Sequence, residues 1–206
     1  MTHSLSIGTD SNQALLLDFQ AALETKPEKA IKLEKDALAQ IENITADNAR
    51  LVSNLHANLG GLYRMNGHPD LAREHMEKSI SLLDQFNLLH INDSIPQIAN
   101  YAMFLTEQQE PERGISELQK LSGIIKEYHS DDCLDYAKVQ ETLGTIYLMT
   151  ANLPQAKTYF KRAFKIYEKI WADEPEMIEA KYQEIQELYP QIGFCIGKNL
   201  SGLLTK

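Results

Sequence analysis

The chain has 206 residues, a net charge of −9, and only 10 glycines and 7 prolines. The negative charge argues against a nucleic-acid binder, because phosphates require clustered Lys and Arg, and no apolar run approaches the length of a membrane-spanning helix. The scarcity of glycine and proline favours long helices over a turn-rich β protein.

The predicted elements are helices joined by short turns. Residues 1–10 carry neither a basic patch nor an apolar run, so we expect a flexible N-terminus rather than a secretory signal. Helices are expected over about 11–24, 25–44, 45–66 and 69–87, and five more should start near residues 94, 111, 133, 153 and 175. These starts carry capping side chains, such as Ser130, Asp131 and Asp132, or an early proline. The ninth helix should end near 189–190, which leaves 191–206 as a C-terminal capping segment.

A period of 42 residues organises these helices. Small and large residues recur in one order 84 residues apart, as Leu59-Gly60-x-x-Tyr63 followed by Ala72, and Leu143-Gly144-x-x-Tyr147 followed by Ala156. Where two antiparallel helices cross closely, only small side chains let the backbones approach. Gly60 is therefore expected to face Ala72, and Gly144 to face Ala156.

Two further copies are weaker. Halfway between the strong copies, Tyr101-Ala102-x-x-Leu105 is followed by Gly114, and one step toward the N-terminus Asp18 and Glu34 break the pattern.

These residues resemble the tetratricopeptide repeat, whose pattern is Leu-Gly-x-x-Tyr, then Ala, then Phe. The usual repeat length is 34 residues, and the longer variant is similar to the repeats of kinesin light chains and their bacterial relatives. The usual Trp position holds His56, Ile98 and Gln140. The usual closing Pro is replaced by Asp84, Lys126 and Glu168, which fits a longer second helix in each repeat.

The resemblance implies an all-α fold of the α-α superhelix class, a right-handed solenoid of antiparallel helix pairs with about nine to ten helices. Residues 11–190 would form one repeat domain of four repeats and a capping helix. The first helix of each repeat would line a concave groove that binds a peptide or partner segment.

Ten residues in register with that groove are candidate partner-binding residues. Asn58, Asn100 and Thr142 recur at the 42-residue spacing, and an amide can both donate to and accept from a peptide backbone; the alternative is that they are solvated polar residues. Methionines beside them suggest an adaptable apolar floor, with core packing as the alternative. The set is Asn54, Asn58, Arg64, Met65, Asn100, Met103, Lys138, Glu141, Thr142 and Thr145.

The sequence offers no catalytic constellation, so we expect neither an enzyme nor a cofactor or metal. Its six histidines lack metal-ligand spacing; His56 lies at a core position and the others are expected in loops or on exposed faces. Cys133 and Cys195 are far apart and are expected to be buried free thiols. The aromatic cluster at 159–167 follows helical spacing and indicates core.

The sequence supports three hypotheses about function, of which the first is favoured. The chain is expected to be a cytoplasmic, non-catalytic scaffold that binds a protein or peptide partner, with no role at nucleic acid or membranes. The alternative is a self-associating structural module, a possible homodimer, that packs through residues 192–204. The third reading is a small-molecule binder or hydrolase that uses the groove.

Overall fold

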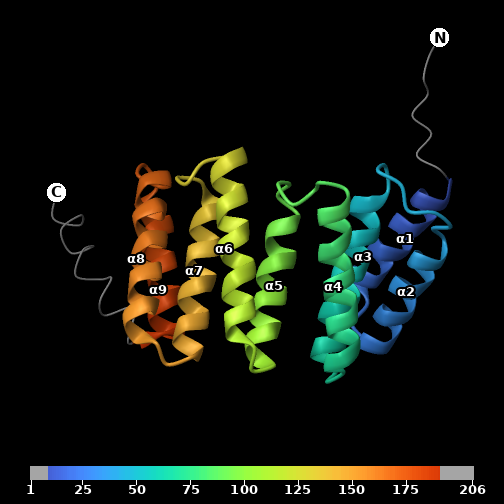
Figure 1. The fold of residues 1–206 in the computed structure, drawn as a ribbon, viewed down its shortest axis with the longest axis horizontal. Coiled ribbons are helices and arrows are strands. Elements are labelled where there is room, and N and C mark those ends of the chain that lie inside the picture. The colour runs from blue at the N-terminus through green and yellow to red at the C-terminus, as the bar shows by residue number, and fades with distance from the viewer. Residues whose placement is uncertain (1–8, 191–206) are drawn as a thin grey trace, which may run out of the picture. The chain divides into compact units, whose positions relative to one another are not determined.

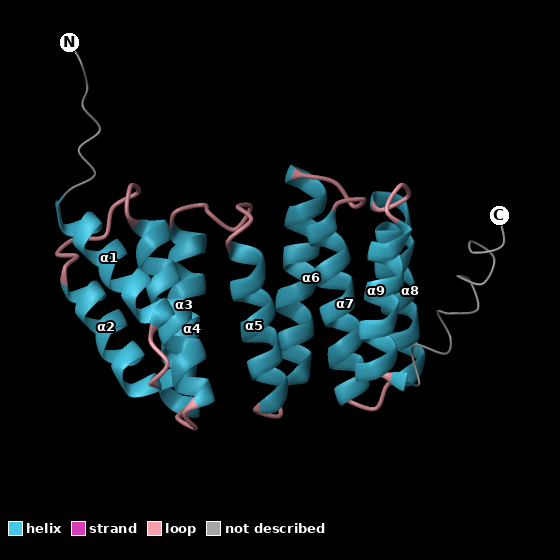
Figure 2. Cartoon of the chain, turned by 180° about the vertical axis from the view of Figure 1, so that it is seen from behind, coloured by secondary structure: helices cyan, strands magenta, loops and turns pink. Residues whose placement is uncertain are grey.

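The computed structural model describes residues 9–190, and of residues 9 and 10 only the backbone. This range forms nine α-helices and no strand (Figures 1 and 2). The chain divides into two compact units, residues 1–101 and 102–206, and the boundary falls inside α5. The helices are α1 (Thr9–Leu23), α2 (Pro27–Ala39), α3 (Ala49–Met65), α4 (Pro69–Gln85), α5 (Ser94–Glu107), α6 (Pro111–Tyr128), α7 (Leu134–Met149), α8 (Leu153–Ile170) and α9 (Pro175–Leu188).

The predicted all-α fold is confirmed, with one boundary that differs clearly. The second helix ends at Ala39 rather than near Ile44, and the third begins at Ala49. The loop between them is held by Asn48, whose side-chain oxygen accepts from the Thr45 backbone N–H at 2.8 Å and whose amide donates to the Asn43 carbonyl at 2.9 Å. These side-chain bonds compete with helical ones and hold residues 43–48 in a loop before α3.

The start of α7 was also predicted imperfectly. Its N-cap is Cys133, whose sulfur accepts from the Tyr136 backbone N–H at 3.4 Å; the predicted caps at 130–132 lie in the preceding loop. Cys133 is half-buried, so it is not the buried thiol expected. Of the N-terminal segment 1–10 that was expected to be flexible, residues 9 and 10 belong to α1. Residues 1–8, Cys195 and the expected C-terminal capping segment 191–206 lie outside the described residues.

In the first unit, α1 pairs with α2 and α3 with α4, and α2 packs on α3. A Cβ placed on Gly60 would lie 3.3 Å from the Ala72 carbonyl oxygen and 2.6 Å from Met76 Cγ, which confirms the predicted close crossing. His56 fills the core position expected of it, and its Nδ1 lies 2.8 Å from Nδ1 of His75. His75 is thus half-buried against the core rather than on an exposed face, a contact between two helices that spacing alone does not show.

In the second unit, two crossings of the same kind are present. A Cβ on Gly114 would lie 2.6 Å from the Ala102 carbonyl oxygen, and one on Gly144 would lie 2.8 Å from the Phe160 ring. The neighbour of Gly144 is therefore Phe160 rather than Ala156, although Ala156 is fully buried. Three members of the aromatic cluster of α8, Phe160, Phe164 and Tyr167, are core as predicted. The fourth, Tyr159, is only half-buried and stacks on Tyr147.

The second helix of each repeat is long. Asp84, Lys126 and Glu168 all lie inside helices, since α4 reaches Gln85, α6 reaches Tyr128 and α8 reaches Ile170. The extra residues of the 42-residue period can lengthen the second helix or its link to the next repeat. The helices continue past the usual proline position, as the missing prolines predicted, and a link over residues 86–93 follows α4.

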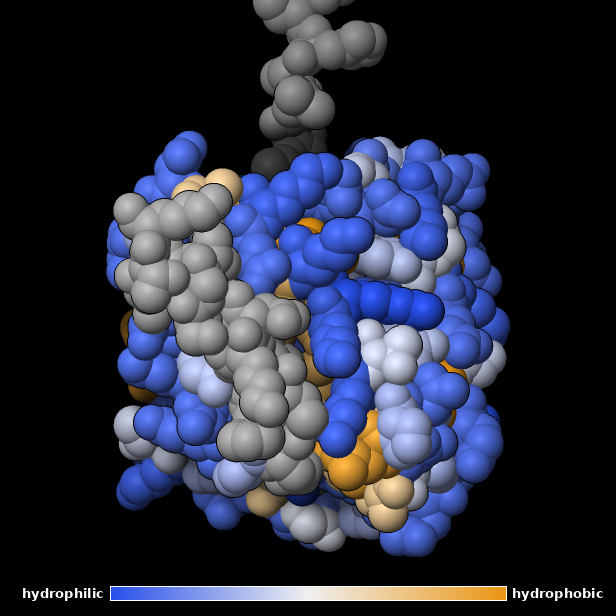
Figure 3. All heavy atoms as spheres, turned by 90° about the vertical axis from the view of Figure 1, so that its left-hand side faces the viewer, coloured by the Kyte–Doolittle hydropathy of each residue, from blue (hydrophilic) through white to orange (hydrophobic). Residues whose placement is uncertain are grey.

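The face of the second unit at α8 and α9 is mostly polar (Figure 3). Figure 3 looks onto the α8–α9 end of the second unit, where hydrophilic side chains cover most of the described face. Over residues 9–190, no helix has the length and hydropathy to cross a membrane.

Candidate partner-binding site

A polar network in the first unit fixes the first helices α3 and α5 to the second helix α4. The side-chain oxygen of Gln97 on α5 accepts hydrogen bonds from the hydroxyls of Ser53 on α3 and Ser79 on α4. Its amide nitrogen donates to the side-chain oxygen of Asn54 at 2.6 Å. Asn54, one of the predicted site residues, thus helps to set the register of α3 and α5.

A cavity of about 220 Å³ lies beside this network. Three of the predicted residues line it, Arg64 and Met65 from α3 and Asn100 from α5. Its full lining is Ala57, Gly61, Arg64, Met65, Met76, Ser79, Gln97 and Asn100. Met65 is 79% exposed and Asn100 is also exposed, so both present their polar or polarisable ends to solvent. A Cβ on Gly61 would meet no atom within 4 Å, which leaves the wall of the cavity open at that point.

Asn58 has a different environment from Asn100. Its side-chain amide donates to Asp18 on α1 at 2.9 Å and to Glu34 on α2 at 3.0 Å. The donors of Asn58 are therefore engaged within the first unit, where they tie three helices together.

Glu34, which breaks the repeat pattern in the sequence, is a buried carboxyl with 2% exposure. Burial, and then the neighbouring Asp18 carboxylate, raise its pKa to about 8. Its Oε2 has no hydrogen-bond partner among the described residues. A proton on that carboxyl supplies a donor for Asp18, so the neutral acid is the form that fits this position at neutral pH.

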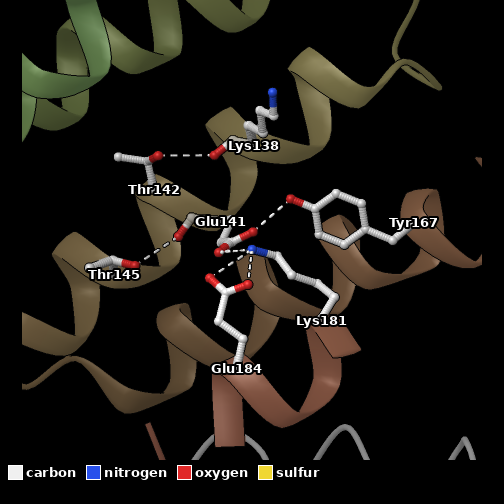
Figure 4. Close-up of polar contacts among 7 residues, drawn as sticks. All are labelled: Lys138, Glu141, Thr142, Thr145, Tyr167, Lys181 and Glu184. Carbon is white, nitrogen blue, oxygen red and sulfur yellow. Dashed lines mark hydrogen bonds and ion pairs between the residues drawn. The ribbon is translucent and has the colours of Figure 1, made fainter. Parts of the chain in front are cut away.

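In the second unit, Glu141 is the centre of a second polar cluster (Figure 4). Its carboxylate accepts from the Tyr167 hydroxyl at 2.6 Å and pairs with the Lys181 ammonium at 2.9 Å, and Lys181 also pairs with Glu184 at 3.1 Å. Burial opposes the charge on Lys181, but Glu141 and Glu184 outweigh it and raise the pKa of the ammonium. Burial and the Glu141 carboxylate raise the pKa of Tyr167, so its hydroxyl stays a donor.

The two predicted threonines of α7 are engaged locally. The hydroxyl of Thr142 donates to the Lys138 backbone carbonyl at 2.9 Å, and that of Thr145 to the Glu141 carbonyl at 3.1 Å (Figure 4). Such bonds to the preceding turn are common for Thr in helices. The hydroxyls of Thr142 and Thr145 therefore point at their own helix.

A second cavity, of about 280 Å³, lies between α7, α8 and α9. Of the predicted residues only Lys138 lines it, with an exposed side chain. The full lining is Leu134, Lys138, Tyr167, Trp171, Met177, Ala180, Lys181 and Glu184. Met103, the last predicted residue, is half-buried on α5 and lines neither cavity.

Several site residues were missed in the sequence. The sequence held one sign of Gln97, because an amide side chain stands between the apolar Ile95 and Ile98 on a helix predicted to line the groove. Glu34 also left one, because a carboxylate at a small-residue position must find a partner if it is buried. Lys181 and Glu184 left no signal in the sequence, since charged residues are common on the surface of a capping helix.

The titratable groups described here form no metal site. Among residues 9–190, no group of three or more His, Cys, Asp and Glu is arranged to hold a metal ion. The His56–His75 contact is a neutral pair, because burial, and then the proximity of His75, lower the pKa of His56 to about 4.

Comparison with known proteins identifies the repeat. Residues 94–169 match the tetratricopeptide repeat family. No curated protein matches the chain in sequence.

Solved structures share the fold at low sequence identity. BtubC (BKLC) from P. vanneervenii is 18% identical with a TM-score of 0.71, over 94% of this chain and 79% of that one. A kinesin light chain-type protein from Podosopora anserina with nearly identical TPR-like repeats is 12% identical, with a TM-score of 0.68 and 81% of each chain covered. The MamA protein is 16% identical, with a TM-score of 0.56 over 80% of this chain and 78% of that one. The matches confirm the predicted fold class, an α-α superhelix.

Proposed function

We propose that the chain, whose residues 94–169 match the tetratricopeptide repeat family and whose fold is that of TPR-like structures, is a non-catalytic, cytoplasmic interaction module that binds an extended segment of a partner protein. The binding face is the first-helix face of α3 and α5 in the first unit, at residues Arg64, Met65 and Asn100. Tetratricopeptide repeat proteins generally act as interaction or scaffold modules, which supports the class of function.

One observation carries the assignment to this face. The cavity beside Gln97 is lined by the consecutive first helices α3 and α5 and by two residues of α4, and three of its residues were expected on the groove face from the repeat register. A volume of about 220 Å³ is below the roughly 300–1,000 Å³ of small-molecule sites, so it suits one or two side chains of a longer segment better than a metabolite.

The chemistry around the cavity fits a peptide. The exposed amide of Asn100 can donate to and accept from one peptide unit. Met65 is flexible and polarisable, which lets it pack against different apolar side chains. The open wall at Gly61 allows a backbone to approach α3 closely.

To obtain a peptide ligand for the test, a displayed random-peptide library is selected against the full chain. The affinity of a selected peptide is then measured by fluorescence anisotropy. Met65→Ser combined with Asn100→Ala should weaken binding at least about tenfold, or ~1.4 kcal/mol, with helicity unchanged by circular dichroism.

Leu71→Ser is the matched control, since it removes an exposed apolar side chain on α4 that does not line the cavity. Equal affinities of the double variant and the wild type would exclude this face as the binding site.

A further inference from the structure

The outer face of α1 is apolar and has no covering element among residues 9–190. Leu15, Leu16, Phe19 and Leu23 are 45%, 49%, 62% and 68% exposed. At 100° per residue these four side chains share one side of the helix. We call them the α1 stripe.

The opposite side of α1 is already occupied. Ala14 and Ala21 are buried, and Leu17 packs into the cluster formed with Ala37 and Leu55. The helix is therefore hydrophobic on both sides, a pattern typical of a helix buried on both sides.

We propose that the α1 stripe is the interface at which two copies of this chain associate, with the two α1 helices antiparallel about a two-fold axis at Phe19. The interface is distinct from the proposed peptide-binding face, which uses α3 and α5.

The spacing of the stripe fits a second copy in particular. Leu15, Phe19 and Leu23 are four residues apart and symmetric about Phe19. In a two-fold interface each contact occurs twice, so an antiparallel pair places Leu15 against Leu23 of the other copy and Phe19 against its equivalent. Leu16 is the one member of the stripe without a leucine counterpart, since the equivalent position about Phe19 is the exposed Ala22.

Charge points the same way. The chain carries a net charge of −9, so two copies repel each other over most of their surfaces. No charged side chain lies within the α1 stripe, and the nearby Asp18 accepts a hydrogen bond from Asn58 on the inner side of α1. Self-association is thus least opposed at this neutral face.

The size of the stripe is compatible with a reversible dimer. Four large side chains with these exposures offer on the order of 400–500 Å² per copy, against the roughly 800 Å² that each partner buries in a standard interface. The neighbouring amide side chains of Asn12, Gln13 and Gln20 are exposed and uncharged, which suits them to the polar rim that surrounds an apolar interface core.

Sedimentation velocity of the full chain, from low micromolar to several hundred micromolar, tests the association. The wild type should shift from monomer to dimer as concentration rises. Phe19→Glu combined with Leu23→Glu should weaken dimerisation at least tenfold. Gln155→Glu combined with Gln186→Glu adds the same charge on the exposed surface of α8 and α9, outside the proposed interface, and should leave the dimer largely intact.

Cysteine cross-linking tests the geometry. Residue 19 lies on the proposed two-fold axis, so the Phe19→Cys variant should form a disulfide-linked dimer through that cysteine under mild oxidation. The Gln13→Cys variant, made separately in the otherwise wild-type chain, should not be cross-linked through residue 13. A chain that is monomeric at every concentration would overturn the proposal. A dimer that Phe19→Cys does not cross-link, and that is lost when residues 191–206 are deleted, would also overturn the proposal. That result would show that the segment 191–206, and not a second α1 helix, forms the interface.

Discussion

At the scale of single residues, Glu34 is the least ordinary side chain of the first unit. It is buried, it accepts from Asn58, and it lies near the Asp18 carboxylate. The folded chain therefore holds a proton that an unfolded chain releases near the ordinary pKa of 4.5. The proton makes the folding free energy depend on pH.

The sign of this dependence follows from proton binding. Between pH 4.5 and about 8 the unfolded state binds fewer protons at Glu34 than the folded state, so stability is highest at the acidic end and is lost as pH rises. The slope is at most about 1.4 kcal/mol per pH unit. Glu34→Gln, which keeps the shape of the neutral acid and a donor toward Asp18, should remove this contribution.

Urea titrations of wild type and Glu34→Gln near both ends of that range provide the test. The stability of the variant relative to wild type should increase toward alkaline pH. Parallel pH profiles for the two proteins would show that Glu34 titrates normally.

The Glu141 cluster gives a second prediction at this scale. Glu141→Ala leaves the Tyr167 hydroxyl and the Lys181 ammonium without their shared partner, and both are largely buried. We expect a loss of about 1–3 kcal/mol in the free energy of unfolding. Glu184→Ala removes a half-exposed partner of the same lysine and should change stability by less than about 1 kcal/mol. Similar losses in chemical denaturation would contradict the central role of Glu141.

Residue-level prediction from the sequence was uneven for a physical reason. The repeat register predicts which face of a helix a residue lies on. It predicted Arg64, Met65 and Asn100 on the groove face, and in the structure these three residues line one cavity. Register says nothing of partners on other helices. It therefore did not show that Asn58 is bound by Asp18 and Glu34.

At the scale of elements, helix crossings at glycine set the packing of each repeat. Gly114 and Gly123 lie on the same helix, α6, in opposite situations. A Cβ on Gly114 would lie 2.6 Å from a backbone carbonyl oxygen, whereas one on Gly123 would meet nothing within 4 Å.

Substituting each glycine by alanine separates packing from helix propensity. Gly114→Ala must push α5 and α6 apart, because the carbonyl of Ala102 cannot rotate away as a side chain could. It should destabilise the chain by about 1–3 kcal/mol. Gly123→Ala should stabilise it by roughly 0.5–1 kcal/mol through the better helix propensity of alanine. Thermal unfolding of both variants checks the pair, and a stable Gly114→Ala variant would refute the close crossing.

Elements were predicted well from the sequence because their signals are local. Early prolines, caps and the 42-residue period placed all nine helices of the described range. The end that moved, at Ala39, precedes a loop in which the Asn48 side chain bonds to the backbone of Thr45 and Asn43. The start of α7 was placed within one residue, but its cap is Cys133 rather than a residue of 130–132.

At the scale of the molecule, the two units carry different sites. The first unit holds the cavity at Arg64, Met65 and Asn100 together with the α1 stripe, and the second holds the cavity between α7, α8 and α9. Repetition in sequence thus gives one fold of repeats but not one repeated site, because side chains at equivalent positions differ. Asn58 and Thr142 are equivalent in register, yet one is bonded across helices and the other within its own.

The central claim is that a partner segment binds beside α3 and α5. The chain contains six methionines, among which Met65 and Met76 line the proposed cavity while Met149 and Met177 lie in the second unit. Methyl-labelled methionine NMR during titration with a selected peptide therefore reports directly on the location of binding. Shifts confined mainly to Met65 and Met76 are the predicted result. Shifts at Met177 or Met149, with Met65 and Met76 unchanged, would contradict the claim.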